Sequence, residues 1–417
     1  MSKAMIISVG VGETVSHGIC CSIRQQNPDY VIFILTKESK EKTLPLVLND
    51  RVMKDRKYEQ VILSDENDVE EVKFGSLKKI EDLMRRFEPK DIAVDYTTGT
   101  KAMSAGITLA ALEKRIGTLV YVSGKRDKNG RVISGTEKVI SIEPNRTYAE
   151  LLFKEAINSF NNCQFNSCLE FINQAKPLVA EFDFQNKIEL LEKLAQAYSL
   201  WDKFDLGKAF LIIDEISKNQ LLSDWGIRRR IENNKEFLHK EKENLFCSER
   251  VVDLFENAKR KGNKEYKFDN AVACLYRCLE YIAQLKIFQK KLYTQNEKME
   301  SDVEALDINK LPSDLKDKYL KYKDEKDGKV KLGLYQDYEL LFDLKDEAGI
   351  IFKNEYENGN LKKLLSLRNK SILAHGFNPI SKDTYEAILT VVEKFVKSLF
   401  PETENLIEKV KFPEIRI

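Results

Sequence analysis

Five short apolar runs in the first third of the chain are the feature that most limits how it can fold. The runs occupy residues 4–10, 30–36, 58–65, 91–96 and 118–124. They are rich in valine and isoleucine and lack polar alternation, which is typical of strands that are buried on both faces. Helical periodicity lies between them, most clearly at residues 76–88 and 101–115. Alternating strands and helices predict a doubly wound, Rossmann-like α/β domain with a parallel sheet.

Residues 125–144, directly after the fifth run, have the pattern of a β-hairpin. Asn129 and Gly130 form the dipeptide that most strongly favours a two-residue hairpin turn. The parallel sheet is therefore expected to end in a hairpin.

Helical periodicity replaces the strand signals from about Thr147 onward. Residues 156–175 and 197–216 look alike, because each contains a helix, a short turn that ends in Phe165 or Phe204, and a second helix. Only two copies of this pattern are visible, so it predicts a small helical spacer and not a solenoid.

A third block begins near Phe246 with a strongly amphipathic helix at residues 267–288. Its apolar stripe contains Ala271, Leu275, Leu279 and Ile282. Residues 289–333 are rich in Lys, Asp and Glu with little periodicity, so we expect an extended loop or a loosely packed insertion there. Helical patterns resume at residues 335–344, 360–376 and 382–400.

The chain is thus expected to combine α/β and all-α domains. We place the domains at residues 1–146, 147–245 and 246–417, a division that fits a length of 417 residues. The net charge is only +1, so any surface for nucleic acid must be local and not chain-wide.

The cysteines and the N-terminus indicate an ordinary cytoplasmic protein. The seven cysteines are Cys20, Cys21, Cys163, Cys168, Cys247, Cys274 and Cys278. Their number is odd and no CxxC occurs, so we interpret them as reduced thiols and not as disulfide or zinc ligands. The N-terminal apolar run is too short for a signal peptide or a membrane span, and no later stretch is long enough.

The loops after the predicted strands are rich in small polar residues. The stretch DYTTGTKAMSAG, residues 95–106, follows a buried strand and leads into a helix, whose N-terminus exposes unpaired N–H groups. The candidate ligand-binding residues in these loops are Gly10, Gly12, Thr14, Thr36, Ser39, Thr97, Thr98, Gly99, Thr100 and Lys101. Neither GxGxxG nor GxxxxGK[ST] is present, so a nucleotide without a triphosphate is favoured. His17 is either part of this rim or a capping or satisfied histidine.

The stretch DYTTGTKAMSAG resembles the ligand loop of CRISPR-associated Rossmann-fold (CARF) domains. The resemblance covers about the first 145 residues. Members often carry a second glycine where Thr98 stands here, which makes this loop slightly stiffer. The resemblance implies that the N-terminal domain binds a cyclic oligoadenylate, either the tetra- or the hexa-adenylate.

Arg368 and His375, with six residues between them, are the second candidate site, together with Asn369. On a helix or at its end, near two turns apart, both side chains can face one side. RNA cleavage without metal needs a base for the 2′-hydroxyl, a cation for the phosphorane and an acid for the leaving oxygen. Histidine can supply the acid or base and arginine the phosphate clamp. One such pair is half a site, and a two-fold dimer supplies the other half.

This stretch resembles the signature of HEPN ribonuclease domains, Arg followed at four to six residues by His, often with Asn after the Arg. The two resemblances together imply an effector endoribonuclease of a type III CRISPR system. It would be a homodimer, activated by cyclic oligoadenylate, that cleaves single-stranded RNA without metal or other cofactor and leaves 2′,3′-cyclic phosphate ends. The resemblance further implies that the sensor domain slowly cleaves its activator, as some family members do.

Other interpretations stay open from the sequence. The chain could be a non-catalytic nucleotide-sensing regulator, or a scaffold whose HEPN-like domain dimerises or binds RNA. Arg277 and Glu280 are interpreted either as an ion pair within one helix or as residues that assist the site of Arg368 and His375. Arg228, Arg229 and Arg230 form a solvated helix face or follow RNA phosphates, and His239 is read as an ordinary helix residue.

Overall fold

The computed structural model of the chain describes residues 2–126, 128, 132–295 and 301–416. Two compact units are present: residues 1–152 with 175–180, and residues 153–174 with 181–417. In the described part of the chain, no helix combines the length and apolar character needed to cross a bilayer. The division into three domains stays a prediction.

The first unit is built on a six-stranded sheet with the order β3-β2-β1-β4-β5-β6. The strands are β1 (Ala4–Val9), β2 (Tyr30–Leu35), β3 (Lys57–Ile62), β4 (Ile92–Asp95), β5 (Thr118–Ser123) and β6 (Lys138–Ile142). Strands β1 to β5 are parallel and β6 pairs antiparallel with β5. The Rossmann-like fold and its five parallel strands are therefore confirmed. The predicted turn at Asn129 and Gly130 lies outside the described residues.

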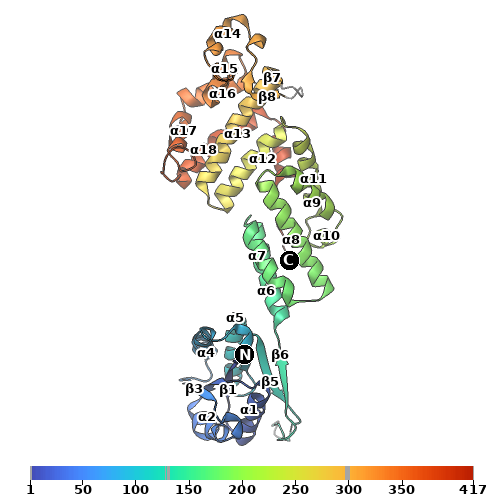
Figure 1. The fold of residues 1–417 in the computed structure, drawn as a ribbon, viewed down its shortest axis with the longest axis vertical. Coiled ribbons are helices and arrows are strands. Elements are labelled where there is room, and N and C mark those ends of the chain that lie inside the picture. The colour runs from blue at the N-terminus through green and yellow to red at the C-terminus, as the bar shows by residue number, and fades with distance from the viewer. Residues whose placement is uncertain (1, 127, 129–131, 296–300, 417) are drawn as a thin grey trace. The chain divides into compact units, whose positions relative to one another are not determined.

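Helices cover both faces of this sheet (Figure 1). They are α1 (Glu13–Gln26), α2 (Lys37–Lys42), α3 (Leu44–Leu48), α4 (Val69–Met84) and α5 (Lys101–Glu113). Side chains of α4 and α5 pack on one face, and those of α1 and α3 pack on the other. Every residue of β1 is buried, which explains why its sequence shows no polar alternation.

Two helical hairpins follow, as the sequence predicts. The helices are α6 (Asn145–Asn161), α7 (Phe165–Ala175), α8 (Phe182–Asp202), α9 (Leu206–Ile216), α10 (Leu221–Asp224) and α11 (Arg228–Glu243). The α6–α7 and α8–α9 turns contain a left-handed residue, Cys163 at φ 60° and Phe204 at φ 61°. Each turn is closed by hydrogen bonds to carbonyls three and five residues back, as at many helix ends. The repeat thus aligns Cys163, and not Phe165, with Phe204.

The C-terminal block is a helical bundle around α13. Its helices are α12 (Ser248–Lys259), α13 (Phe268–Gln289), α14 (Ser313–Leu320), α15 (Leu334–Asp343), α16 (Glu347–Glu357), α17 (Leu361–Asn369), α18 (Lys382–Leu399) and α19 (Thr403–Val410). The predicted stripe on α13 is fully buried, with Ala271, Leu275, Leu279 and Ile282 each at 0% exposure. It packs against α12, α15 and α18.

The charged segment 289–333 is not an extended loop, so this prediction was wrong. Two antiparallel strands, β7 (Tyr293–Gln295) and β8 (Ser301–Leu306), and helix α14 lie within it. Several of its apolar side chains are buried, among them Leu292, Leu311, Tyr319 and Val330, although Leu320 is exposed. Each short element contributes only one or two of them, so no periodicity is visible in the sequence.

Candidate functional site

A cavity of about 280 Å³ lies at the carboxyl ends of β1 and β4. These strands are neighbours at the point where the strand order reverses, the usual ligand site of doubly wound sheets. Five of the predicted ligand residues line the cavity: Gly10, Thr14, Thr97, Thr98 and Gly99.

The two loops that form this cavity touch each other. The Thr98 hydroxyl donates to the Ser8 carbonyl and accepts from the Gly10 N–H at 3.1 Å, while the Ser8 hydroxyl donates to the Thr98 carbonyl at 2.5 Å. A Cβ atom on Gly10 would lie 2.7 Å from the Gly99 nitrogen, and Gly99 has a φ of 99°. Both glycines are therefore needed for the close approach, and the Thr98 hydroxyl fastens the loops together.

Asp95, at the end of β4, orients Thr97. Its Oδ1 atom accepts from the Thr97 N–H at 2.9 Å, and the Thr97 hydroxyl accepts from the Val122 N–H at 2.8 Å. The Asp95 side chain is buried, and this burial raises its pKa although Ser22 and Thr97 act to lower it.

Thr100 and Lys101 begin α5 but do not line the cavity. The Thr100 hydroxyl accepts from the Met103 N–H at 3.1 Å and donates to the Glu66 carbonyl at 2.6 Å, so it caps the helix. Lys101 is exposed, and its ammonium has no ion pair or hydrogen bond within the described part of the chain.

Three other predicted ligand residues have structural roles instead. Thr36 and Ser39 form the capping box that starts α2, and both are buried. The N–H of Gly12, a residue with φ 136°, donates to the Thr43 hydroxyl at 3.1 Å. The hydroxyls after β2 are thus occupied by hydrogen bonds within their own loop, a difference that the residue types alone do not reveal.

Among the lining residues that sequence reasoning missed, three are polar: Tyr121, Arg126 and Glu137. Tyr121 stacks on Tyr96 with 5.7 Å between the ring centroids, and its hydroxyl accepts from Arg126 at 3.3 Å. Tyr121 was hidden because it sits inside an apolar run that reads as a strand. His17 lies in α1, where its Nδ1 atom is 2.7 Å from the Glu137 carboxylate.

The second candidate site lies at the end of α17. This helix ends at Asn369, so His375 is not on a helix face as the sequence pattern suggested. A tight turn returns the chain instead, and the His375 N–H donates to the Asn369 carbonyl at 3.2 Å. The turn therefore brings the predicted catalytic residues Arg368, Asn369 and His375 to the same end of the helix.

This turn is held by its backbone. The N–H groups of Ala374 and Gly376 donate to the Ser371 carbonyl at 3.0 and 3.1 Å, and Ser371 is only 2% exposed. A Cβ atom on Gly376 would lie 2.1 Å from the Lys370 carbonyl oxygen, so glycine is required there. His375 itself is exposed.

Arg368 is held by an aromatic ring of α13. Its guanidinium carbon lies 3.8 Å from the centroid of Tyr276, and its Nη1 atom donates to Asn369 Oδ1 at 3.2 Å. Burial, and then the charge of Glu280, raise the pKa of the Tyr276 hydroxyl, while Arg368 acts to lower it. Arg277 pairs with Glu280 at 3.4 Å, which favours the intrahelical ion pair over a role in the site.

Large apolar side chains surround these polar residues and face solvent. Ile372 is 62% exposed, Leu373 47% and Phe377 89%. Leu367 on α17 is also exposed. Exposed apolar groups clustered along one short segment are typical of an interaction surface.

Other candidate features have partners within the C-terminal unit. Arg228 donates to the Ser217 and Asn219 carbonyls and so holds the segment between α9 and α10, whereas Arg230 donates to the Glu408 carbonyl in α19. His239 Nδ1 lies 3.3 Å from a Glu243 oxygen on the same helix. All seven cysteines are free thiols.

Known proteins match both halves of the chain. A family model of the Card1 CARF domain matches residues 20–146, and one of the Csm6 HEPN domain matches residues 239–399. No curated protein matches the sequence.

One solved structure shares the fold over almost the whole chain, and a second aligns only in part. Enterococcus italicus Csm6 bound to cyclic hexa-2′-fluoro-hexa-dAMP aligns with 99% of this chain and 100% of its own, at 14% identity and a TM-score of 0.54. A type III CRISPR defence DNA nuclease activated by cyclic oligoadenylate aligns with 47% of this chain and 34% of its own, at 14% identity and a TM-score of 0.27. The two family models, the Rossmann-like sheet and the helical C-terminal block place the chain in the CRISPR-associated effector family that joins a CARF domain to a HEPN domain.

Proposed function

We propose that this chain is an endoribonuclease of type III CRISPR defence that cyclic oligoadenylate activates. The CARF domain binds the cyclic nucleotide, and the HEPN domain cleaves single-stranded RNA. The observation that carries this proposal is the turn after α17, which holds His375 against Asn369 beside the stacked Arg368.

The chemistry needs no metal ion. The imidazole of His375 takes the proton of a ribose 2′-hydroxyl or gives one to the leaving 5′-oxygen. The 2′-oxygen forms a bond to phosphorus, the bond from phosphorus to the 5′-oxygen breaks, and a 2′,3′-cyclic phosphate remains. Arg368 stabilises the charge on the phosphorane, because a guanidinium binds two phosphate oxygens at once.

A second copy of the chain completes the site. One histidine serves one proton transfer at a time, and the reaction needs both an acid and a base. Ile372, Leu373 and Phe377 supply an apolar surface around the motif, which supports a two-fold contact between HEPN domains. Each copy then contributes one Arg368 and one His375.

The CARF pocket fits part of a cyclic oligoadenylate. A cavity of about 280 Å³ is at the lower limit for a drug-sized ligand, and a ring of four or six nucleotides is larger. Two pockets related by a two-fold axis would share one ring, with Lys101 and the start of α5 near its phosphates and Tyr121 beside a base. Slow cleavage of the bound ring in this pocket is also part of the proposal.

The test is an RNA cleavage assay of the full chain against cyclic tetra- and hexa-adenylate, with and without EDTA. We expect cleavage that needs one of the rings, survives EDTA and yields 2′,3′-cyclic phosphate ends. Ring binding without any RNA cleavage would instead favour a non-catalytic regulator or scaffold. Strict dependence on added metal would contradict the proposed mechanism.

A further inference from the structure

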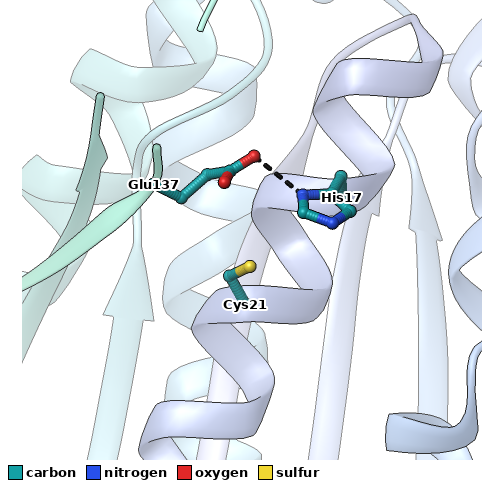
Figure 2. A group of neighbouring side chains, drawn as sticks. All are labelled: His17, Cys21 and Glu137. Carbon is teal, nitrogen blue, oxygen red and sulfur yellow. Dashed lines mark hydrogen bonds and ion pairs between the residues drawn. The ribbon is translucent and has the colours of Figure 1, made fainter. Parts of the chain in front are cut away.

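A histidine and a cysteine of α1 meet a carboxylate from the segment that leads into β6 (Figure 2). The His17 Nδ1 or Nε2 atom, the Cys21 Sγ atom and a Glu137 carboxylate oxygen all lie within 4.8 Å of one another. We propose that these three side chains bind a divalent transition-metal ion, for which Zn²⁺ is the best candidate. The proposal concerns the CARF domain alone and does not depend on the ribonuclease function.

The fold fixes the three donors in place. His17 and Cys21 are four residues apart in α1, so they lie on one face, one turn from each other. Glu137 precedes β6, and β6 is tied to the same helix because the Gln25 and Gln26 side chains donate to the Val139 carbonyl at 3.3 Å and the Ser141 hydroxyl at 2.7 Å. The site therefore joins a helix to a strand more than a hundred residues later in the chain.

Glu137, a half-buried residue, brings a carboxylate to this site. Its side chain is 5% exposed, and Gly135 donates an N–H to its Oε2 atom at 2.6 Å. Burial by itself raises the pKa of this carboxyl, but hydrogen bonds from its own backbone, His17 and Gly135 leave the pKa below its ordinary value. The hydrogen bond from Gly135 holds this carboxylate where it can share a cation with His17 and Cys21.

Cys21 supplies the donor that selects for a transition metal. Burial, and then the charge of Glu137, raise the pKa of this thiol, while Arg24 acts to lower it. The charge of Arg24 is partly offset by Asp50, 3.7 Å away. A metal ion converts a coordinating thiol to the thiolate, so binding should release a proton.

The donor set is that of a zinc site with one open position. Nitrogen, sulfur and oxygen donors from three residues, with a water as the fourth ligand, are common around Zn²⁺. Donors at zinc bond lengths of about 2.0 to 2.3 Å lie roughly 3.5 Å apart in a tetrahedron. His17 and Glu137, now hydrogen-bonded at 2.7 Å, would separate slightly as the ion enters. Magnesium and calcium are disfavoured because both prefer oxygen ligands.

The simpler interpretation is that His17 and Glu137 form only a hydrogen bond that docks β6 on α1. Cys21 would then be a small side chain that fills space next to them. The two interpretations differ in one measurable property, the formation of a metal–thiolate bond at Cys21.

Titration with Co²⁺ tests the proposal on the full chain after tag removal and chelation. Cobalt replaces zinc in such sites, and its thiolate complexes absorb in the near ultraviolet. We expect this band to saturate at one ion per chain and to vanish when Zn²⁺ is added, with proton release on binding. Absence of the band in the wild-type chain would overturn the proposal.

Single substitutions locate the site. Cys21→Ala should abolish the band, whereas Cys20→Ala, at the adjacent cysteine that faces the core, should keep it. Loss of a residue that only supports a ligand weakens metal binding by roughly 10- to 100-fold. His17→Ala and Glu137→Gln each remove a ligand itself, so each should weaken Co²⁺ binding by at least that factor. His239→Ala is the matched control for His17 and should bind normally. A band that persists in Cys21→Ala, or unchanged affinity in both His17→Ala and Glu137→Gln, would refute the site even if one variant folds poorly.

Discussion

The guanidinium carbon of Arg368 lies 3.8 Å from the centre of the Tyr276 ring, so the end of α17 is stacked on α13. An aromatic face attracts a cation without occupying its N–H groups. One of these groups, at Nη1, donates to Asn369 Oδ1. Stacking on Tyr276 fixes the position of the guanidinium, and its other N–H groups remain able to bind a phosphate.

Tyr276→Ala should lower RNA cleavage without changing activator binding. Loss of a cation–π contact of about 0.5 to 2 kcal/mol corresponds to roughly a two- to thirtyfold lower kcat/KM. Tyr276→Phe keeps the ring and should cleave at nearly the wild-type rate. Single-turnover cleavage at saturating activator measures both variants. Equal loss in both would show that the hydroxyl, and not the ring, matters.

His375→Ala should abolish cleavage and leave cyclic oligoadenylate binding intact. General acid–base catalysis contributes about a hundredfold to ten-thousandfold to a rate. His239→Ala, which removes a half-exposed histidine from α11, is the matched control and should retain activity. Wild-type cleavage by the purified His375→Ala protein would remove this residue from the mechanism.

Ile372→Asp should reduce cleavage by about tenfold or more if the apolar segment contacts a second HEPN domain, because burying an unpaired carboxylate costs several kcal/mol. Leu211→Asp is the control, since Leu211 on α9 is 67% exposed and Ile372 is 62% exposed. Sedimentation velocity and cleavage rates at several protein concentrations measure the effect. Full activity of Ile372→Asp would mean that this segment is not a dimer contact.

The sequence predicted the sheet well because its central strands β1, β2 and β4 are buried on both faces and therefore read as apolar runs. It also located the cavity loops, since Gly10 directly follows β1 and Gly99 lies in the loop after β4. Polar residues in these loops were harder to assign. Thr36 and Ser39 look like ligands in the sequence, yet their hydroxyls cap α2.

Contacts between distant residues could not be predicted. Tyr276 and Arg368 are on different helices, and neither residue type reveals the stacking. Helical periodicity around His375 suggested a helix, whereas Gly376 allows the backbone to approach Lys370 and close a turn. The cluster of His17, Cys21 and Glu137 likewise needs the antiparallel addition of β6, which a single sequence does not place against α1.

Asp95→Asn should make the protein more stable at pH 7 and change it little near pH 4. The folded-state pKa of Asp95 is raised above its unfolded value, so the folded state favours the protonated acid. The free energy of unfolding then falls as pH rises from the unfolded pKa to the folded pKa. The total loss is about 1.4 kcal/mol for each pH unit that separates the two pKa values. Asparagine stays neutral and keeps the acceptor for the Thr97 N–H.

Thermal unfolding of both proteins across this pH range is the measurement. The melting temperature of Asp95→Asn should exceed that of the wild type increasingly as pH rises. A constant difference between pH 4 and pH 7 would show that Asp95 does not titrate in this range.

Lys101→Ala should weaken cyclic oligoadenylate binding by roughly tenfold or more. A charge-assisted hydrogen bond contributes about 1.5 to 3 kcal/mol, and each copy in a dimer would lose one. Lys37→Ala is a close control, because Lys37 also begins a helix directly after a capping threonine and is also exposed. It should bind the ring as wild type does.

Calorimetric titration with cyclic tetra- and hexa-adenylate compares these variants with Gly99→Trp, which fills the cavity. Lys101→Ala should need more activator for RNA cleavage but reach the same maximum rate, because Arg368 and His375 are untouched. A lower maximum would mean that Lys101 transmits activation as well as binding the ring. If Lys101→Ala and Gly99→Trp both bind each ring as tightly as wild type, the activator does not bind at the loop after β4, and the cavity there has another role.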